Sequence, residues 1–222
     1  MDHATGWARR LLGVGEHPGG VRLSRRVLDV LDLPAGSLVV DIACGRGTTL
    51  DLLADRGLLA IGVDLRAGHP RSVVGDAQRL PLRTGAYDGV VVECAVSTFA
   101  DPVVALTEVA RVLGTGGRWA LTDVLLRRDL APDRVVAAVD RFTTARSLTG
   151  YAQLAASAGL VVTRSENRPG DALALLRRLR RLLPWSTDVR ACEQAVRHGT
   201  LGYGLLSGTV APPSRPPVRL PD

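Results

Sequence analysis

The feature that most constrains this chain is a short apolar run that leads into a glycine turn. Residues 38–42 are apolar except for Asp41, Gly45 and Gly47 follow, and a helical apolar pattern begins at once. A buried parallel strand that turns tightly into a helix has this form. Glycines let a bound molecule approach backbone N–H groups, and a helix start presents unpaired donors and a partial positive charge. The segment therefore predicts an α/β fold with a pocket for a carboxylate, a phosphate or a ribose edge.

A second apolar run, residues 59–64, also ends in an acid, Asp64. Asp64 follows Gly47 at close to the roughly 20-residue spacing at which an acid reaches a ribose diol. Two hydroxyls on adjacent carbons can both donate to one carboxylate, so Asp64 is predicted to bind a ribose. Glycine turns also join strands to helices for purely geometric reasons, and the glycines alone leave that alternative open.

Further along the chain, the motifs resemble those of class I S-adenosylmethionine-dependent methyltransferases, in the family order. Residues 41–47 resemble the first motif, an acid followed by three residues and Gly-x-Gly, and Asp64 matches the ribose-binding acid. Residues 75–81 resemble the adenine-side motif, 87–94 the fourth strand and 113–119 the turn into the fifth. Together these motifs are far more specific than any one of them.

This resemblance implies a fold and a cofactor. The fold is a single Rossmann-like doubly wound sheet of seven mainly parallel strands, the last one antiparallel, with helices on both faces. The cofactor is S-adenosyl-L-methionine, which would leave as S-adenosylhomocysteine after in-line methyl transfer. The cofactor-binding residues implied by the motifs are Asp41, Ala43, Gly45, Gly47, Asp64, Leu65, Asp76, Ala77 and Glu93.

An NAD-binding fold is the main competitor for the first two motifs. Such a fold usually has three glycines as G-x-G-x-x-G, and the position of the third glycine is Leu50 in this chain. A dinucleotide pyrophosphate needs that open helix start, whereas the single amino-acid tail of S-adenosylmethionine does not. The sequence therefore favours the methyltransferase interpretation.

Length and composition favour one domain. With 222 residues, 46% of them hydrophobic, the chain can bury a substantial core. We expect a methyltransferase domain over residues 1–211 and a proline-rich tail over 212–222. Within the domain, residues 1–33 are predicted to form a lid and a helix, in which residues 17–20 could reach the methionine end of the cofactor. Residues 127–200 are predicted to include helices that bind the acceptor or act as a lid.

Methyl transfer from a sulfonium needs alignment and desolvation, with a base only where the acceptor carries a proton. The best-placed reactive groups are Glu93 and Cys94 at the end of the fourth strand and Asp123 at the end of the fifth, because open α/β sheets keep their reaction sites at the carboxyl ends of strands. These three are the predicted catalytic residues. Cys44, inside the glycine turn, is predicted to be a packing residue. The expected acceptor is a small molecule, methylated on O, N, S or C.

Cys94 allows a sharper alternative. Residues 92–97 and 121–128 resemble the arsenite methyltransferase branch, in which a cysteine after the fourth strand binds the soft As(III) centre. That branch has another metalloid-binding cysteine before the sixth strand, and residues 141–146 contain none. Cys192 could replace it only if the C-terminal helices fold over the site. Arsenite methylation therefore stays an alternative to a conventional acceptor.

The chain carries a net charge of +6, which raises the question of nucleic-acid binding. Its most basic stretch, residues 171–183, places leucines along one helical face and Arg177, Arg178, Arg180 and Arg181 largely on the other. Aromatic residues make up only 4% of the chain, so few side chains could stack on single-stranded bases. We interpret the arginines mainly as a solvated face; a nucleic-acid methyltransferase remains an alternative, as does a cofactor-binding protein without turnover.

The remaining expectations concern location and assembly. No stretch approaches the ~18 apolar residues needed to span a bilayer, and the N-terminus has no signal pattern. We therefore expect a cytoplasmic protein without a membrane partner, as a monomer or homodimer. The three cysteines are scattered, form no zinc motif and are expected to be reduced thiols, so no metal site is predicted.

Overall fold

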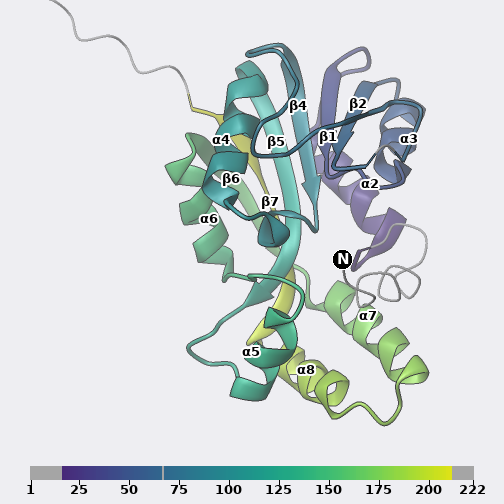
Figure 1. The fold of residues 1–222 in the computed structure, drawn as a ribbon, viewed down its shortest axis with the longest axis vertical. Helices are drawn as coiled ribbons and strands as arrows, with labels where there is room; N and C mark the ends of the chain where they lie inside the picture. The colour runs from purple at the N-terminus through teal and green to yellow at the C-terminus, as the bar shows by residue number, and fades with distance from the viewer. Residues whose placement is uncertain (1–16, 67, 212–222) are drawn as a thin grey trace, which may run out of the picture.

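The computed structural model describes residues 17–66 and 68–211, which form a seven-stranded sheet with helices on both faces (Figure 1). The strand order is β3-β2-β1-β4-β5-β7-β6, and β7 runs antiparallel to both of its neighbours while the other pairs are parallel. The predicted fold class is confirmed. The strands are β1 (Leu38–Ile42), β2 (Leu59–Asp64), β3 (Ser72–Val74), β4 (Tyr87–Glu93), β5 (Leu113–Leu126), β6 (Leu160–Asn167) and β7 (Leu201–Val210).

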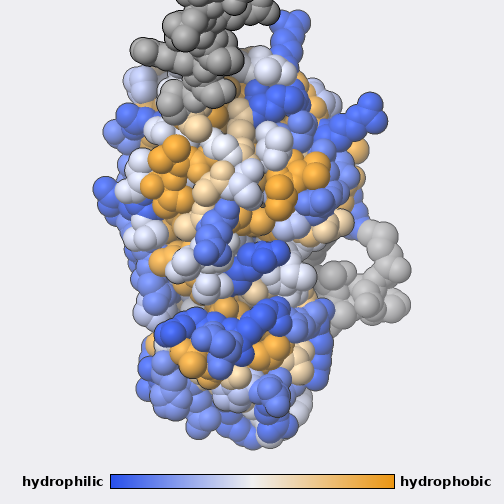
Figure 2. Space-filling view, turned by 90° about the vertical axis from the view of Figure 1, so that its left-hand side faces the viewer, coloured by the Kyte–Doolittle hydropathy of each residue, from blue (hydrophilic) through white to orange (hydrophobic). Residues whose placement is uncertain are grey.

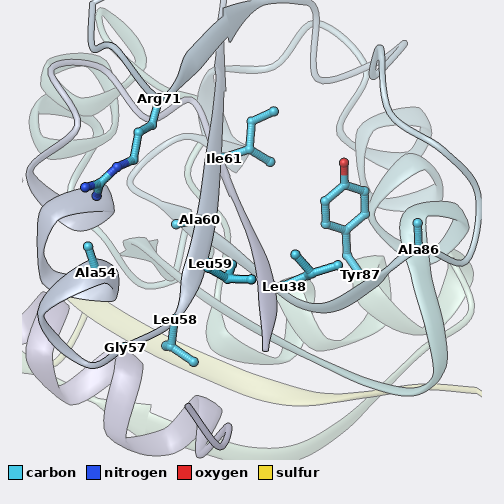
Figure 3. Close-up of a pocket in the computed structure, with 10 residues that line it drawn as sticks. All are labelled: Leu38, Ala54, Gly57, Leu58, Leu59, Ala60, Ile61, Arg71, Ala86 and Tyr87. Atoms are coloured by element: carbon cyan, nitrogen blue, oxygen red, sulfur yellow. The ribbon is translucent and has the colours of Figure 1, made fainter. Parts of the chain in front are cut away.

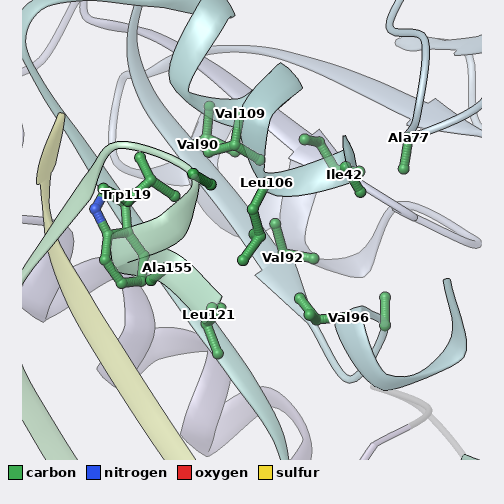
Figure 4. Packing of buried hydrophobic residues seen from close by; sticks show 14 of the residues in the cluster. Ile42, Ala77, Val90, Val92, Val96, Leu106, Val109, Trp119, Leu121 and Ala155 are labelled. Carbon is green, nitrogen blue, oxygen red and sulfur yellow. The ribbon is translucent and has the colours of Figure 1, made fainter. Parts of the chain in front are cut away.

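The helices cover the two faces because strand side chains alternate between them. Val40, Val92 and Trp119 face one cluster, together with α4 and α6, as Figure 4 shows for part of that cluster. Val39 and Val91 face the other cluster, with α2 and α3. The helices are α2 (Gly20–Leu31), α3 (Thr48–Asp55), α4 (Pro102–Val112), α5 (Asp133–Asp140), α6 (Leu148–Ser157), α7 (Pro169–Leu182) and α8 (Thr187–Arg197), with the 3-10 turn η1 (Val96–Thr98).

The strand order reverses between β1 and β4. The chain leaves β1 toward β2 and β3 on one side, and β4, β5, β7 and β6 continue on the other side. In open α/β sheets, ligands bind in the crevice outside the carboxyl ends of the strands at such a switch point. The ends of β1 and β4 are therefore the place to look for a site.

The helices α5, α7 and α8 gather beyond these strand ends, at the lower end of Figure 1. On the face shown in Figure 2, hydrophilic residues cover most of this lower part, and hydrophobic residues surface between them. None of the described helices is long and apolar enough to cross a membrane.

A glycine sets the start of α2. Helix α2 begins at Gly20 because Gly19, with φ of 85°, takes the left-handed conformation at the N-cap. The glycine therefore precedes the helix and does not interrupt it. The N-cap of α6 is Ser147, whose hydroxyl accepts from Gly150 N at 3.0 Å.

Two strands, β5 and β3, differ from what the sequence predicted. Strand β5 begins at Leu113, where a turn into a strand from Trp119 was expected, because Leu113 already pairs with Tyr87 before the register shifts. The third strand, to which the sequence had assigned no residues, is the three-residue β3 at the edge of the sheet. No helix lies between β2 and β3 among the described residues of this connection. The predicted tail, residues 212–222, and residues 1–16 of the predicted lid lie outside the described residues.

A test of this packing uses two glycines that differ in their surroundings. A Cβ at Gly208 in β7 would lie 1.7 Å from Val161 O of β6, whereas a Cβ at Gly170 in α7 would meet nothing within 4 Å. Gly208→Ala should lower the free energy of unfolding by about 1–3 kcal/mol or more because the strands must separate. Gly170→Ala should change it by less than about 0.5 kcal/mol. Urea unfolding followed by circular dichroism measures both, and equal stabilities would contradict the β6–β7 packing.

Candidate functional site

Two residues in strained backbone conformations flank the switch point. Ala43, just after β1, has φ of 60°, and Cys94, just after β4, has φ of 54°. Residues other than glycine rarely take positive φ, at a cost of about 1–3 kcal/mol each. Each still donates its backbone N–H to a neighbouring strand, Ala43 to Val63 O and Cys94 to Thr122 O, both at 2.7 Å. Such outliers cluster at functional sites, where the surrounding structure holds them in place.

The carboxylate of Glu93, at the end of β4, is the most heavily bonded acid at this edge. Thr49 Oγ1 of α3 donates to Glu93 Oε1 at 2.7 Å, and Ser24 Oγ of α2 donates to Oε2 at 3.2 Å. His17 Nε2 lies 3.3 Å from Oε2 and is nearly buried. His17 thus brings the N-terminal segment to Glu93, and an approach of residues 17–20 to the methionine end of a cofactor stays a prediction.

Asp41 lies one strand away and is almost completely buried. One of its carboxylate oxygens, Oδ2, is buried and has no hydrogen-bond partner among the described residues. Its pKa is raised well above the usual value, first by burial and then by the negative charges of Glu93 and Asp64. A cationic ligand at this place would offset the repulsion among the three acids.

Asp64 closes the site on the β2 side. Its carboxylate accepts from Gly45 N and from Arg66 N, both at 3.0 Å, which fixes the acid against the glycine turn. Gly45 and Asp64, separate in the sequence, are thus brought together, and the binding of a ribose by Asp64 stays a prediction. Leu65 beside them is 72% exposed and free to lie against a ligand.

Gly47 has two structural reasons to be glycine. Its φ is 82°, and a Cβ would lie 2.5 Å from ring carbons of His69. The imidazole of His69 thus occupies the space that the missing side chain leaves, held by Asp51 Oδ1 at 3.2 Å from its Nε2. Contact between Gly47 and a cofactor stays a prediction.

The adenine-side motif continues from the same edge. Gly75 N donates to Asp64 O at 2.9 Å, so the motif begins directly beside the ribose-binding acid. The Asp76 carboxylate accepts from Gln78 N at 2.9 Å and is otherwise exposed, while Ala77 is buried in the core. Asp76 is therefore accessible, as its predicted role requires.

Cys94 stands against the buried end of β7. The hydroxyl of Tyr203 hydrogen-bonds with the Cys94 thiol and lies 3.1 Å from Thr122 Oγ1. Burial, followed by the nearby charge of Asp123, raises the pKa of the Cys94 thiol to about 12. The side chain is therefore a neutral thiol at neutral pH.

Asp123 is buried and fully bonded. Its carboxylate accepts from Ser97 N, Ser97 Oγ and Val124 N at 2.7–2.8 Å. Burial raises its pKa to about 6, against the lowering effect of these hydrogen bonds. Ser97 O in turn accepts from the backbone and hydroxyl of Thr144. Asp123 thus holds the turn after β4 in place, and its predicted catalytic role stays a prediction.

The other two cysteines are also neutral. Cys44 Sγ packs where a Cβ of Gly62 would lie, at 2.5 Å, and its pKa is raised to about 12, mainly by burial. Cys44 therefore packs, as predicted. Cys192 is buried in α8, and burial raises its pKa to about 11. No group of three or more metal-ligating side chains occurs in the part of the chain that the structure describes.

Two hollows lie elsewhere. One, of about 610 Å³, is at the starts of β1, β2 and β4 and is lined by Leu38, Leu59 and Tyr87, among others (Figure 3). It is at the opposite end of the strands from Glu93 and Asp64, so it does not belong to this site. The other, of about 340 Å³, lies among α5, α7, α8 and β7 and has Tyr203 in its wall.

Sequence reasoning missed the side chains that support the acids. Ser24 and Thr49, which bond to Glu93, lie on helices far from it in the chain. Tyr203, which bonds to Cys94, lies on the distant strand β7. The available signal was a polar residue on the apolar face of each helix. Ser24 sits between Leu23 and Val27 in the buried stripe of α2.

Comparison with known proteins agrees with this geometry. Residues 40–121 match a family model described as a methyltransferase domain. A demethylmenaquinone methyltransferase of Corynebacterium kroppenstedtii is 35% identical over 101 residues, which are 42% of this chain and 44% of that protein. Another, of Beutenbergia cavernae, is 34% identical over 113 residues, 46% and 47% of the two chains. The chain thus matches less than half the length of these curated relatives.

The whole fold has solved counterparts. One is geranyl diphosphate C-methyltransferase of Streptomyces coelicolor, crystallised with Mg²⁺, geranyl-S-thiolodiphosphate and S-adenosyl-L-homocysteine. It superimposes with a TM-score of 0.74 at 21% identity over 91% of this chain and 84% of that one. At this identity the likeness establishes the fold alone. The predicted resemblance to class I methyltransferases is confirmed by the domain match and the shared fold.

The thiol environments give a direct test. A shift of the pKa of Cys94 from about 9 to about 12 lowers the thiolate fraction about a thousandfold at pH ~8. Iodoacetamide should therefore label Cys44, Cys94 and Cys192 far more slowly in the folded protein than in urea, as measured by mass spectrometry of tryptic peptides. Rapid labelling of Cys94 in the folded protein would contradict a buried neutral thiol.

Proposed function

We propose that this protein is an S-adenosylmethionine-dependent methyltransferase that acts on a small-molecule acceptor. The observation that carries the proposal is the convergence of Asp41, Asp64 and Glu93 on the glycine turn at the switch point, with Asp41 Oδ2 buried and unpaired. These acids suit a ligand that carries positive charge and a ribose. The domain match and the methyltransferases that share the fold support the same activity.

The residues present fit S-adenosylmethionine. Asp64 would accept from the ribose hydroxyls, Asp76 and Ala77 with Leu65 would hold the adenine, and Asp41, Ala43, Gly45, Gly47 and Glu93 would surround the methionine end. Bound S-adenosylmethionine supplies a methyl group on a positively charged sulfur, so an electron pair of the acceptor forms the new bond as the bond to sulfur breaks and S-adenosylhomocysteine remains.

The chain's own contribution is alignment and exclusion of water. Ser24, Thr49 and His17 fix the Glu93 carboxylate, and Asp123 fixes the turn that carries Cys94. Glu93, Cys94 and Asp123 are the proposed catalytic residues, of which Asp123 acts by positioning. Burial disfavours the charged form of the Asp123 carboxyl and so raises its pKa to about 6. The negative charge that Asp123 carries at neutral pH is therefore held at a cost in desolvation.

The alternatives are weaker. For arsenite, the Cys94 thiol would have to ionise from a pKa of about 12, and it already bonds to Tyr203. Nucleic-acid binding by α7 is also less well supported: Arg180 Nη1 donates to Glu193 Oε2 at 3.0 Å, and leucines of α7 line the hollow of about 340 Å³, so this helix serves internal packing.

A cytoplasmic location and a monomeric or homodimeric state remain part of the proposal.

Isothermal titration calorimetry tests the cofactor. We expect binding of S-adenosylmethionine and S-adenosylhomocysteine and none of NAD. Asp64→Ala should weaken binding by about 1.5–3 kcal/mol, the usual scale of a hydrogen bond to a charged group. Asp55→Ala, an exposed acid at the end of α3, is the matched control and should bind as the wild type does. Binding of NAD, or unchanged affinity in Asp64→Ala, would contradict the assignment.

Methylation assays with As(III) separate the two acceptor classes. We expect no As(III) methylation by the wild type, and S-adenosylmethionine affinity within a few-fold in Cys94→Ser, because the thiol is not a metal ligand in this account. Turnover of As(III) that is lost in Cys94→Ser and in Cys192→Ser would establish the arsenite alternative instead.

A further inference from the structure

The hollow of about 340 Å³ lies next to the candidate site and is almost entirely apolar. Leucines 175, 176 and 179 of α7 form one wall, Ala138 and Val139 of α5 another, and Tyr203 of β7 part of the inner end. These leucines are only half-buried, although they lie on the inner side of an amphipathic helix. An apolar ligand in the hollow would complete their burial, which is favourable by about 25 cal/mol per Å².

The hollow shares two walls with the cofactor side. Pro18 lines it, while the preceding residue, His17, contacts Glu93 at 3.3 Å. Tyr203 also lines it, while its hydroxyl bonds to the thiol of Cys94, the residue after Glu93. A molecule in the hollow would therefore adjoin the end of β4, where the methyl group is transferred in the proposed function.

One residue in the wall of the hollow has a buried hydroxyl without a partner among the described residues. Thr143 lines the hollow, and the Thr143 Oγ1 atom is buried with no hydrogen-bond partner among the described residues. A buried hydroxyl left unpaired costs about 1–3 kcal/mol, which a ligand with one hydrogen-bonding group would offset.

The charges at the rim indicate which ligands the hollow does not suit. Among the described residues that line it, Arg141 is the one cationic side chain. Arg141 Nη1 donates to Asp188 Oδ2 at 3.2 Å, and Arg134 Nε donates to Oδ1 of the same acid at 3.1 Å. Asp188 also lines the hollow whereas Arg134 does not, so the charges of the lining residues Arg141 and Asp188 cancel and the lining has no net positive charge for a phosphate or diphosphate group.

We infer that this hollow binds the methyl acceptor, and that the acceptor is a neutral, largely hydrocarbon small molecule with one hydrogen-bonding group that reaches Thr143. The identification of this ligand as the methyl acceptor rests on the proposed function. The ligand class itself rests on the lining, the unpaired hydroxyl and the paired arginine. The volume suits a ring system of modest size, since ligand pockets run from about 300 to 1,000 Å³.

Three probes of one shape test the ligand class: 1-naphthol, naphthalene and 1-naphthyl phosphate, each followed by the change in its own fluorescence on binding to the full chain. We expect 1-naphthol to bind more tightly than naphthalene and far more tightly than 1-naphthyl phosphate. Tightest binding of the phosphate would overturn the neutral class, and no binding of either neutral probe would overturn the site.

Two neighbouring alanines of α5 locate the binding. Ala138 lines the hollow and Ala137 is exposed. Ala138→Phe should fill the hollow and weaken 1-naphthol binding at least about tenfold, a loss of about 1.4 kcal/mol, while Ala137→Phe leaves it within about twofold. Equal affinities in these two variants would place the probe elsewhere and overturn the inference.

Thr143→Val keeps the shape and removes the hydroxyl, so it tests the hydrogen bond even if Ala138→Phe fails to fold. The affinity for 1-naphthol should fall roughly three- to tenfold, and that for naphthalene should not fall. An equal loss for both probes would contradict the role of Thr143. These measurements need no cofactor, so failure of S-adenosylmethionine binding with intact probe binding would refute the proposed function alone.

Discussion

Carboxylates held out of water at the ends of two neighbouring strands are the constraint on which this site depends. Asp41 of β1 lies opposite Val91 of β4, two residues before Glu93, and the side chains of Asp41 and Glu93 are both buried. Burial of like charges is costly unless each is hydrogen-bonded or paired. Glu93 is hydrogen-bonded by hydroxyls from α2 and α3, whereas one oxygen of Asp41 remains unpaired. The chain as a whole is basic, yet this edge is acidic, which suits a cationic ligand.

The N-terminal segment links this acidic edge to the apolar hollow. His17 contacts Glu93, and the adjacent Pro18 lines the hollow among α5, α7 and α8. The segment is held by Asp171 at the start of α7, which pairs with Arg22 of α2 and with Arg168. The acidic edge and the neutral, apolar hollow therefore adjoin each other at this segment. That division suits a reaction between a cationic donor and a neutral acceptor.

The local parts of the site could be predicted from the sequence, and the long-range parts could not. The turn from Asp41 to Gly47 and the acid Asp64 follow from patterns in adjacent residues, and the sheet brings Gly45 to within 3.0 Å of Asp64. The partners Ser24, Thr49 and Tyr203 depend on how helices and β7 pack, which no local pattern encodes. The hollow of about 340 Å³ could not be predicted from the sequence, which indicated only acceptor or lid helices over residues 127–200, because its walls come from α5, α7, α8 and β7 together.

The central claim is that the acids at the ends of β1, β2 and β4 bind a cationic cofactor. The most direct test compares the affinities of S-adenosylmethionine and S-adenosylhomocysteine, which differ by the sulfonium charge, from mildly acidic to mildly basic pH. The pKa of Asp41 is raised in the free protein, and a bound cation would lower it, so binding should release a proton and tighten as pH rises. The account predicts that S-adenosylmethionine gains more affinity than S-adenosylhomocysteine over this range. Equal pH dependence of the two ligands would contradict it.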